Sequence, residues 1–306
     1  MSNENTAEQS YDGPALPSTG GLRIAVVGLG RAGLALASEL HAAGCQLVAL
    51  WNRSERPIPE CLTGIPTQFG GESPAASLIE TANLVLLAVH DSAIRALAAS
   101  LQPAEGAVLL HLSGALSTSA FGPLRADLHA GCYHPLQSFR TTRSPGFAVP
   151  PYCLALEGDE QAIQAGRHLA ETTGHPWVIL PPEGKAAYHA AAVMTSGCMV
   201  ALHSAASAAL KQAGIAEDDC WPLLWPLAVG TLANLADGDF AGSLTGPVAR
   251  GDAETVRRNL EALSGQPQLA ELYRALGLQG LELASQAGLE ESRRKATARA
   301  LTEDEE

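Results

Sequence analysis

The chain is short of basic charge and has no long apolar run. Its 306 residues include 19 Lys and Arg against 32 Asp and Glu, which gives a formal net charge of −13. An acidic surface repels phosphate groups, so this balance argues against nucleic acid and anionic lipid as partners. No run approaches the roughly 20 apolar residues of a membrane span. With 46% hydrophobic and 17% charged residues, the composition instead indicates a well-buried globular protein.

Paired cysteines and metal-binding clusters are also missing. The six cysteines form no CxxC pair, and no Cys/His cluster has zinc spacing. Residues 1–21 are polar and lack the apolar segment of a signal peptide. These absences predict reduced thiols and no metal, in a cytoplasmic protein with a disordered tail at 1–21 and an acidic tail at 302–306.

Strand and helix patterns alternate over residues 22–181 and then stop. Short apolar runs have the length of buried strands, at 23–27, 46–52, 83–90, 107–114, within 130–139, 152–158 and 176–180. We therefore predict an α/β Rossmann domain with a doubly wound, mainly parallel sheet. Only helical patterns follow, at 185–213, 219–236, 252–263, 267–287 and 289–301. They predict an all-α domain, 182–301, which is expected to hold the substrate.

A glycine motif follows the first predicted strand and opens a helix. It consists of Gly28, Leu29, Gly30, Arg31, Ala32 and Gly33. In this context the first glycine permits a tight turn, the second admits a diphosphate to the backbone, and the third allows close packing of helix on sheet. The helix N-terminus adds a partial positive charge. The motif predicts a dinucleotide cofactor.

The residues at the end of the second predicted strand indicate whether the dinucleotide is NAD(H) or NADP(H). Asn52, Arg53 and Ser54 stand where an NAD site usually has Asp or Glu. A guanidinium can hold a 2′-phosphate bidentately, so NADP(H) is favoured over NAD(H). After the next strand, Val89, His90 and Asp91 are expected beside the nicotinamide ribose, although Asp91 is also a candidate helix cap.

Polar side chains at two further strand ends are candidates for the chemistry. Ser113, followed by Gly114, and His134 are predicted to form a hydroxyl–imidazole pair at the substrate, with Gln137 nearby. A histidine held by a backbone carbonyl is the alternative for His134.

The first helix of the second domain is apolar nearly all round, which predicts burial. Lys185, His189 and Ser196 share one face at i+3/i+4 spacing. The helix N-terminus and partial desolvation would disfavour the charged form of Lys185 and favour a general-acid role. A solvated lysine at the helix start is the alternative. In a predicted loop at 244–252, Arg250 is a candidate for a substrate carboxylate and Asp252 for a helix cap.

Together these motifs resemble a bacterial family that joins a Rossmann-like domain to an all-helical domain of unknown function, DUF2520. They are GLGRAG, NRS, HLSGAL, YHPLQSF, GKAAYHAAAV and LTGPVARGD, within residues 22–290. The family is related to ketopantoate reductase, pyrroline-5-carboxylate reductase and prephenate dehydrogenase. The resemblance implies a 6-phosphogluconate-dehydrogenase-like helical domain that supports a homodimer. It also implies that Ser113 and His134 contact the reacting hydroxyl and that Lys185 donates the proton.

The leading hypothesis is an NADP(H)-dependent oxidoreductase that transfers a hydride to or from a small keto, hydroxy, imine or amine substrate carrying a carboxylate. The alternative is an NADP(H)-binding sensor or scaffold without turnover. It is kept open by Gly197, which stands where the family often has Asn after Ser196. A third hypothesis has a deazaflavin as the hydride partner.

Overall fold

The structure is a computed structural model, and it describes residues 21–139 and 151–303. These residues form two compact units that divide between Ser196 and Gly197. The predicted N-terminal tail up to residue 20 and the last three residues of the predicted acidic tail lie outside the described ranges.

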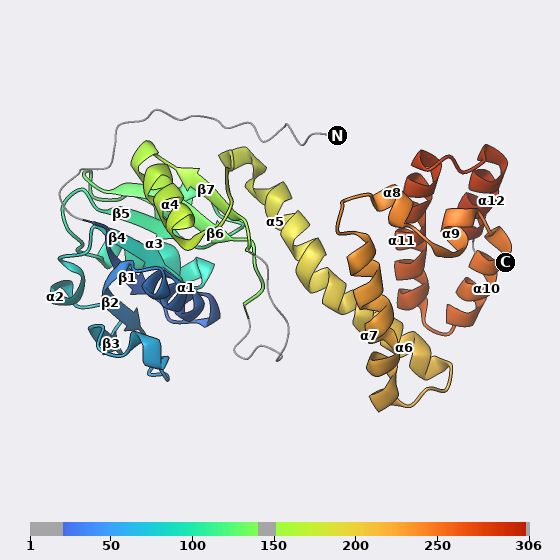
Figure 1. The fold of residues 1–306 in the computed structure, drawn as a ribbon, viewed down its shortest axis with the longest axis horizontal. Coiled ribbons are helices and arrows are strands. Elements are labelled where there is room, and N and C mark those ends of the chain that lie inside the picture. Colours follow the sequence, from blue (N-terminus) through green and yellow to red (C-terminus); the bar gives the residue numbers. More distant parts are fainter. Residues whose placement is uncertain (1–20, 140–150, 304–306) are drawn as a thin grey trace. The chain divides into compact units, whose positions relative to one another are not determined.

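The first unit is built on one eight-stranded sheet (Figure 1). The strand order is β3-β2-β1-β4-β5-β6-β7-β8, and every neighbouring pair is parallel except β6 and β7. This is the predicted doubly wound, mainly parallel arrangement, in which the carboxyl ends of β1, β4, β5 and β6 meet at one edge. The strands are β1 (Arg23–Val27), β2 (Gln46–Asn52), β3 (Thr67–Phe69), β4 (Leu84–Leu87), β5 (Val108–His111), β6 (His129–Pro135), β7 (Leu154–Gly158) and β8 (Trp177–Ile179).

Helices cover both faces of this sheet. On β1, Ile24 and Val26 face the layer that holds α1 (Arg31–Ala42) and α4 (Glu160–Thr173). The alternate residues of β1 face the layer that holds α2 (Ala76–Ile79) and α3 (Ile94–Ser100). Because successive side chains of a strand point to opposite faces, an unbroken apolar strand requires cover on both sides.

Local signals begin and end these helices. Asp159 caps the start of α4 by accepting from the Ala162 N–H at 2.9 Å, and α4 ends at Gly174 with φ +74°. Gly44, which follows α1, has φ +83°. Glycine reaches this left-handed conformation without the steric cost of a side chain.

The chain is helical from residue 182 onward. The helices are α5 (Lys185–Val193), a π-helical turn (Met194–Cys198), α6 (Met199–Gln212), α7 (Glu217–Asn234), α8 (Phe240–Ser243), α9 (Gly246–Arg250), α10 (Ala253–Leu263), α11 (Pro267–Gln286) and α12 (Glu291–Thr302). The predicted cap is confirmed, because Asp252 Oδ1 accepts from the Thr255 N–H at 3.0 Å. The predicted loop at 244–252 is wrong, since α9 forms there. Its Pro247 stands in the first turn, where proline fits a helix.

The stretch Pro182–Gln212 departs from expectation in its burial and in its polar face. By length and composition this stretch could cross a membrane, because it is rich in Ala and poor in charge. It was also predicted to be buried, yet no residue of its most apolar 18-residue window is buried within the chain. Moreover, the π-helical turn adds a residue to the helical repeat. The single polar face predicted from a 3.6-residue period is therefore interrupted before Ser196.

Candidate functional site

The glycine motif forms a tight turn between β1 and α1. Gly28 has φ +99°, and a Cβ there would collide with the carbonyl oxygen of Ala88. A Cβ on Gly33 would collide with the carbonyl oxygen of Gly28. At Gly30, by contrast, a Cβ would meet no atom within 4 Å, and no side chain caps the start of α1. The helix N-terminus therefore has free N–H groups and space for a diphosphate to approach the backbone.

Asn52 supports this turn from the end of β2. Its Oδ1 accepts from the Leu29 N–H at 2.9 Å, and its Nδ2 donates to the Ser54 carbonyl at 2.6 Å. The amide is thus used within the loop, which leaves Arg53 as the exposed cation at the predicted 2′-phosphate position. Arg56 was not predicted. Its Nε is buried and lacks a hydrogen-bond partner among the described residues, so Arg56 is a second candidate for an anion.

The loops after β4 and β5 are joined by a hydrogen bond that was not predicted. Ser113 Oγ donates to Asp91 Oδ2 at 3.0 Å, and it accepts from the backbone N–H groups of Ala115 and Leu116. The structure therefore pairs the Ser113 hydroxyl with Asp91 and not, as predicted, with His134. Nor does Asp91 cap the following turn, because that position belongs to His90, whose ring accepts from the Ser92 N–H. Val89 lies against Gly28.

Lys185 is buried under the same edge of the sheet. Its side chain is 3% exposed, and Nζ donates to the Ser113 carbonyl at 3.1 Å and contacts Cys132 Sγ at 2.9 Å. Nζ also lies 3.6 Å from Glu157 Oε2, while the other oxygen of Glu157 accepts from the Thr118 N–H at 3.0 Å. The alternative of a solvated lysine at the helix start is therefore wrong.

His134 lies between two side chains of α5. Its Nδ1 is 2.7 Å from the Tyr188 hydroxyl, and its ring meets the His189 ring with centroids 6.5 Å apart. Burial, reinforced by the charge of Lys185 and by His189, lowers the pKa of His134 to about 4. His134 is therefore neutral near pH 7. Tyr188 was missed by the sequence analysis, although it lies one turn beyond Lys185 in the same motif.

The structure gives the local surroundings of four other residues that the sequence singles out. Gln137 Oε1 accepts from its neighbour's N–H at 2.7 Å, and the hydroxyl of Ser196 donates to the Ala192 carbonyl at 2.7 Å. Arg250 is exposed in the second unit. A Cβ added to Gly197 would meet no atom within 4 Å, so the Asn that the family often has would fit there.

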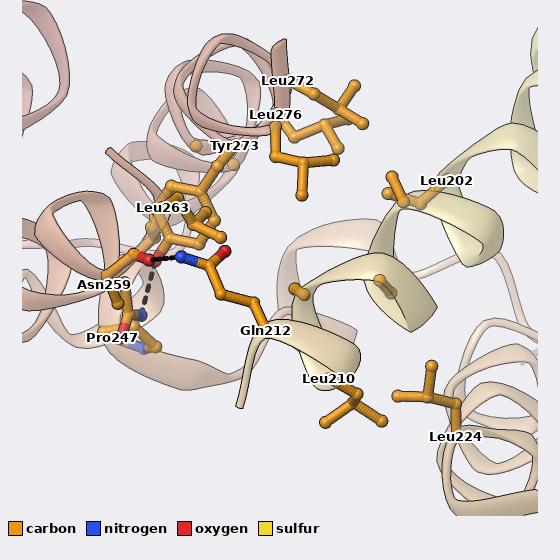
Figure 2. Close-up of a pocket in the computed structure, with 18 of the residues that line it drawn as sticks. Leu202, Leu210, Gln212, Leu224, Pro247, Asn259, Leu263, Leu272, Tyr273 and Leu276 are labelled. Atoms are coloured by element: carbon orange, nitrogen blue, oxygen red, sulfur yellow. Dashed lines mark hydrogen bonds between the residues drawn. The ribbon is translucent and has the colours of Figure 1, made fainter. Parts of the chain in front are cut away.

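A separate apolar pocket of about 760 Å³ lies in the helical unit, between α6, α10 and α11 (Figure 2). Leucines such as Leu202, Leu263 and Leu276 line it, and Asn259 Nδ2 donates to the Tyr273 hydroxyl at 2.9 Å on its wall. None of the predicted site residues lines this pocket.

Comparison with known proteins agrees with this architecture. Residues 23–113 match the family model described as NADP oxidoreductase coenzyme F420-dependent, and residues 152–279 match that of the domain of unknown function DUF2520. No curated protein matches the chain by sequence.

Three solved structures share the fold. A Bacteroides fragilis protein assigned as an NADP oxidoreductase is 22% identical with a TM-score of 0.68, and the match covers 86% of this chain and 98% of that one. The 1-pyrroline-5-carboxylate reductase from Streptococcus pyogenes is 15% identical with a TM-score of 0.57, and the match covers 86% of this chain and 99% of that one. The reductive aminase from Aspergillus terreus, in complex with NADPH and ethyl levulinate, is 17% identical with a TM-score of 0.55. The match covers 88% of this chain and 95% of that one. This chain therefore combines a segment that matches the model of the coenzyme F420-dependent NADP oxidoreductases with a segment that matches the DUF2520 model.

Proposed function

We propose that the protein is an NADP(H)-dependent oxidoreductase acting on a small keto, hydroxy, imine or amine substrate that carries a carboxylate. The observation that carries the proposal is the open backbone at Gly30, next to a strand end that offers Arg53 and no carboxylate at positions 52–54. The matched segment 23–113 covers this loop, and the description of its family model names both NADP and coenzyme F420, which is a deazaflavin. The match therefore supports the nucleotide and is also consistent with the hypothesis of a deazaflavin as hydride partner. The aminase with a similar fold was solved with NADPH.

Different residues at the sheet edge would bind different parts of the cofactor and the substrate. The N–H groups at the start of α1 would hold the diphosphate, and Arg53 with Arg56 the 2′-phosphate. His90, Asp91, Ser113 and Gly114 would line the nicotinamide ribose. When bound, NADPH supplies the hydride. His134 orients the substrate, while the enclosed Lys185 acts through Ser113 and His134 and does not contact the substrate itself.

Nucleotide binding tests this proposal first. We expect NADPH to raise the melting temperature of the full chain more than NADH does. In Arg53→Gln, NADPH should bind about 10- to 100-fold more weakly, because a charge-assisted hydrogen bond to the phosphate is lost. NADH binding should hardly change. If neither nucleotide at millimolar concentration alters the melting temperature, the proposal is wrong.

Turnover separates an enzyme from a nucleotide-binding sensor. The purified chain should oxidise NADPH, followed by its absorbance, with at least one member of a panel of keto acids and cyclic imines. Binding of NADPH without oxidation across the whole panel would favour the sensor.

We also propose that a second copy of the chain covers the exposed apolar side chains of the helices. On α7, Trp221, Leu223, Trp225 and Leu227 are between 41% and 69% exposed. Exposed apolar area on this scale marks an interface. Since Lys185 within Pro182–Gln212 is charged and buried against the sheet, we favour a homodimer in the cytoplasm over insertion into a bilayer.

The mass in solution tests the dimer. Light scattering should give twice the chain mass of 31.7 kDa. Leu227→Asp should shift the mass towards one chain, because it places a charge in the covered face. Arg258→Asp, on an exposed position of α10, is the control and should leave the mass unchanged. A wild-type mass of one chain would disprove the dimer.

A further inference from the structure

Tyr188 has a single hydrogen-bond partner among the residues that the structure describes. Its hydroxyl lies 2.7 Å from His134 Nδ1, and the two rings meet edge to face with centroids 5.5 Å apart. Both residues belong to the first unit. One turn earlier in α5, Lys185 is anchored to the Ser113 carbonyl, so the start of this helix is held against the sheet edge. The position of Tyr188 relative to His134 is thereby determined by buried contacts.

The direction of this hydrogen bond follows from the chemistry of the two groups. Burial raises the pKa of Tyr188, so the hydroxyl keeps its proton near neutrality. His134 is neutral, because burial and the nearby Lys185 and His189 outweigh the opposite effect of Asp91. A protonated hydroxyl that is half-buried needs an acceptor, and Nδ1 is the one in reach. The hydroxyl therefore donates to Nδ1, which leaves the ring proton of His134 on Nε2.

The other side of His134 faces Gly114. A Cβ added to Gly114 would lie 2.6 Å from His134 Nε2 and 2.8 Å from His189 Nδ1, so both ring nitrogens border the same point. His189 Nδ1 is buried and has no hydrogen-bond partner among the described residues. Buried polar atoms are rarely left unpaired, and a ligand atom is one way to satisfy them. The two nitrogens are close enough for one oxygen atom to hydrogen-bond to both.

We propose that Tyr188 is a positioning residue that holds His134 as its Nε2–H tautomer, and that this N–H and His189 Nδ1 together bind the reacting oxygen of a carbonyl or hydroxyl substrate. This inference rests on the proposed function and narrows its substrate class. An alcohol oxygen would accept from His134 Nε2–H and donate to His189 Nδ1. A protonated imine nitrogen has no lone pair, so it could donate to His189 Nδ1 but could not accept from His134 Nε2–H.

In alcohol oxidation, His189 Nδ1 would take the hydroxyl proton as the C=O bond forms. The C–H bond would break at the same time, and its hydride would leave for bound NADP⁺. In the direction of reduction, protonated His189 returns that proton to the oxygen. His134 keeps its proton throughout and stabilises negative charge on the oxygen.

Nitrogen NMR of the full chain with ¹⁵N-labelled histidine tests the tautomer without any substrate. His134→Gln assigns the signals of His134. We expect the wild-type ring to carry its proton on Nε2 and to stay neutral down to pH 5.5. In Tyr188→Phe the ring should become a mixture of tautomers, because the donor that makes Nδ1 the acceptor is gone. The pKa of His134 should stay low, because burial, Lys185 and His189 are unchanged.

The control is Tyr273→Phe, which removes a hydroxyl from the helical unit and should leave the His134 signals unchanged. Unchanged melting temperatures would show that both variants fold. A wild-type ring protonated on Nδ1, or an unaltered ring in Tyr188→Phe, would overturn the positioning role.

Turnover tests the substrate class. Keto acids should oxidise NADPH, cyclic imines should not, and Tyr188→Phe should lower kcat about 10- to 100-fold. Turnover of imines alone would overturn the substrate class while the proposed function stands. Failure to bind NADPH would instead defeat the proposed function, and the tautomer measurement would still be valid.

Discussion

Replacing Lys185 by methionine is expected to lower the free energy of unfolding by about 3–5 kcal/mol, because it removes one partner of a buried ion pair. The side chains of Lys185 and Glu157 are each 3% exposed, and Nζ lies 3.6 Å from Oε2. Without the ammonium group, Glu157 keeps its hydrogen bonds to Thr118 but carries an uncompensated charge away from water. Urea denaturation followed by circular dichroism measures the loss.

Two further variants test whether burial of the ion pair causes the loss of unfolding free energy in Lys185→Met. Lys211→Met removes an exposed pair, in which Nζ lies 3.3 Å from Glu217, and should cost less than about 1 kcal/mol. The double variant Lys185→Met with Glu157→Gln should recover much of the loss, because an amide has no charge to leave unpaired. A loss in Lys185→Met as small as that in Lys211→Met would contradict the buried pair.

Replacing Gly30 by valine is expected to weaken NADPH binding at least about 100-fold while the protein stays folded, since about 2.7 kcal/mol of binding free energy corresponds to that factor. No atom within 4 Å would meet a Cβ at Gly30, and its φ of −63° suits any residue. The branched side chain would occupy the space through which a diphosphate reaches the N–H groups of α1. Titration calorimetry with NADPH and NADH measures the effect.

Both nucleotides should be weakened equally by Gly30→Val, because they share the diphosphate, whereas Arg53→Gln should affect NADPH alone. Gly33→Ala is the contrasting variant. Its Cβ would collide with the carbonyl oxygen of Gly28, so it should lower the melting temperature as well as the affinity. Normal NADPH binding by a folded Gly30→Val protein would show that the diphosphate does not lie at this turn.

Elements with local signals were predicted closely. The strands Arg23–Val27 and Gln46–Asn52 have the predicted bounds, since β-branched and apolar runs act within a few residues. The burial of Pro182–Gln212 was predicted wrongly, because the sequence pattern of an apolar helix is the same whether the chain itself or another surface covers it. The short helix at Gly246–Arg250 was missed because Gly and Pro usually mark a turn.

The candidate site was predicted in part. Parallel strands bring their carboxyl ends to one edge, so Ser113 and His134 could be placed there from strand order alone. The hydrogen-bond partners of Ser113 and His134 could not be predicted in this way. Ser113 bonds to Asp91, and His134 to Tyr188, across separations of 22 and 54 residues that no periodicity describes.

The amino-acid sequence by itself determined the glycine turn, the Arg53 position and the order of strands and helices, because steric and hydrogen-bonding preferences of neighbouring residues specify them. Only the tertiary structure decided that Lys185 is enclosed with Glu157, and that Tyr188 and His189 flank His134. Such contacts depend on which side chains packing brings together, and burial then sets their charge states.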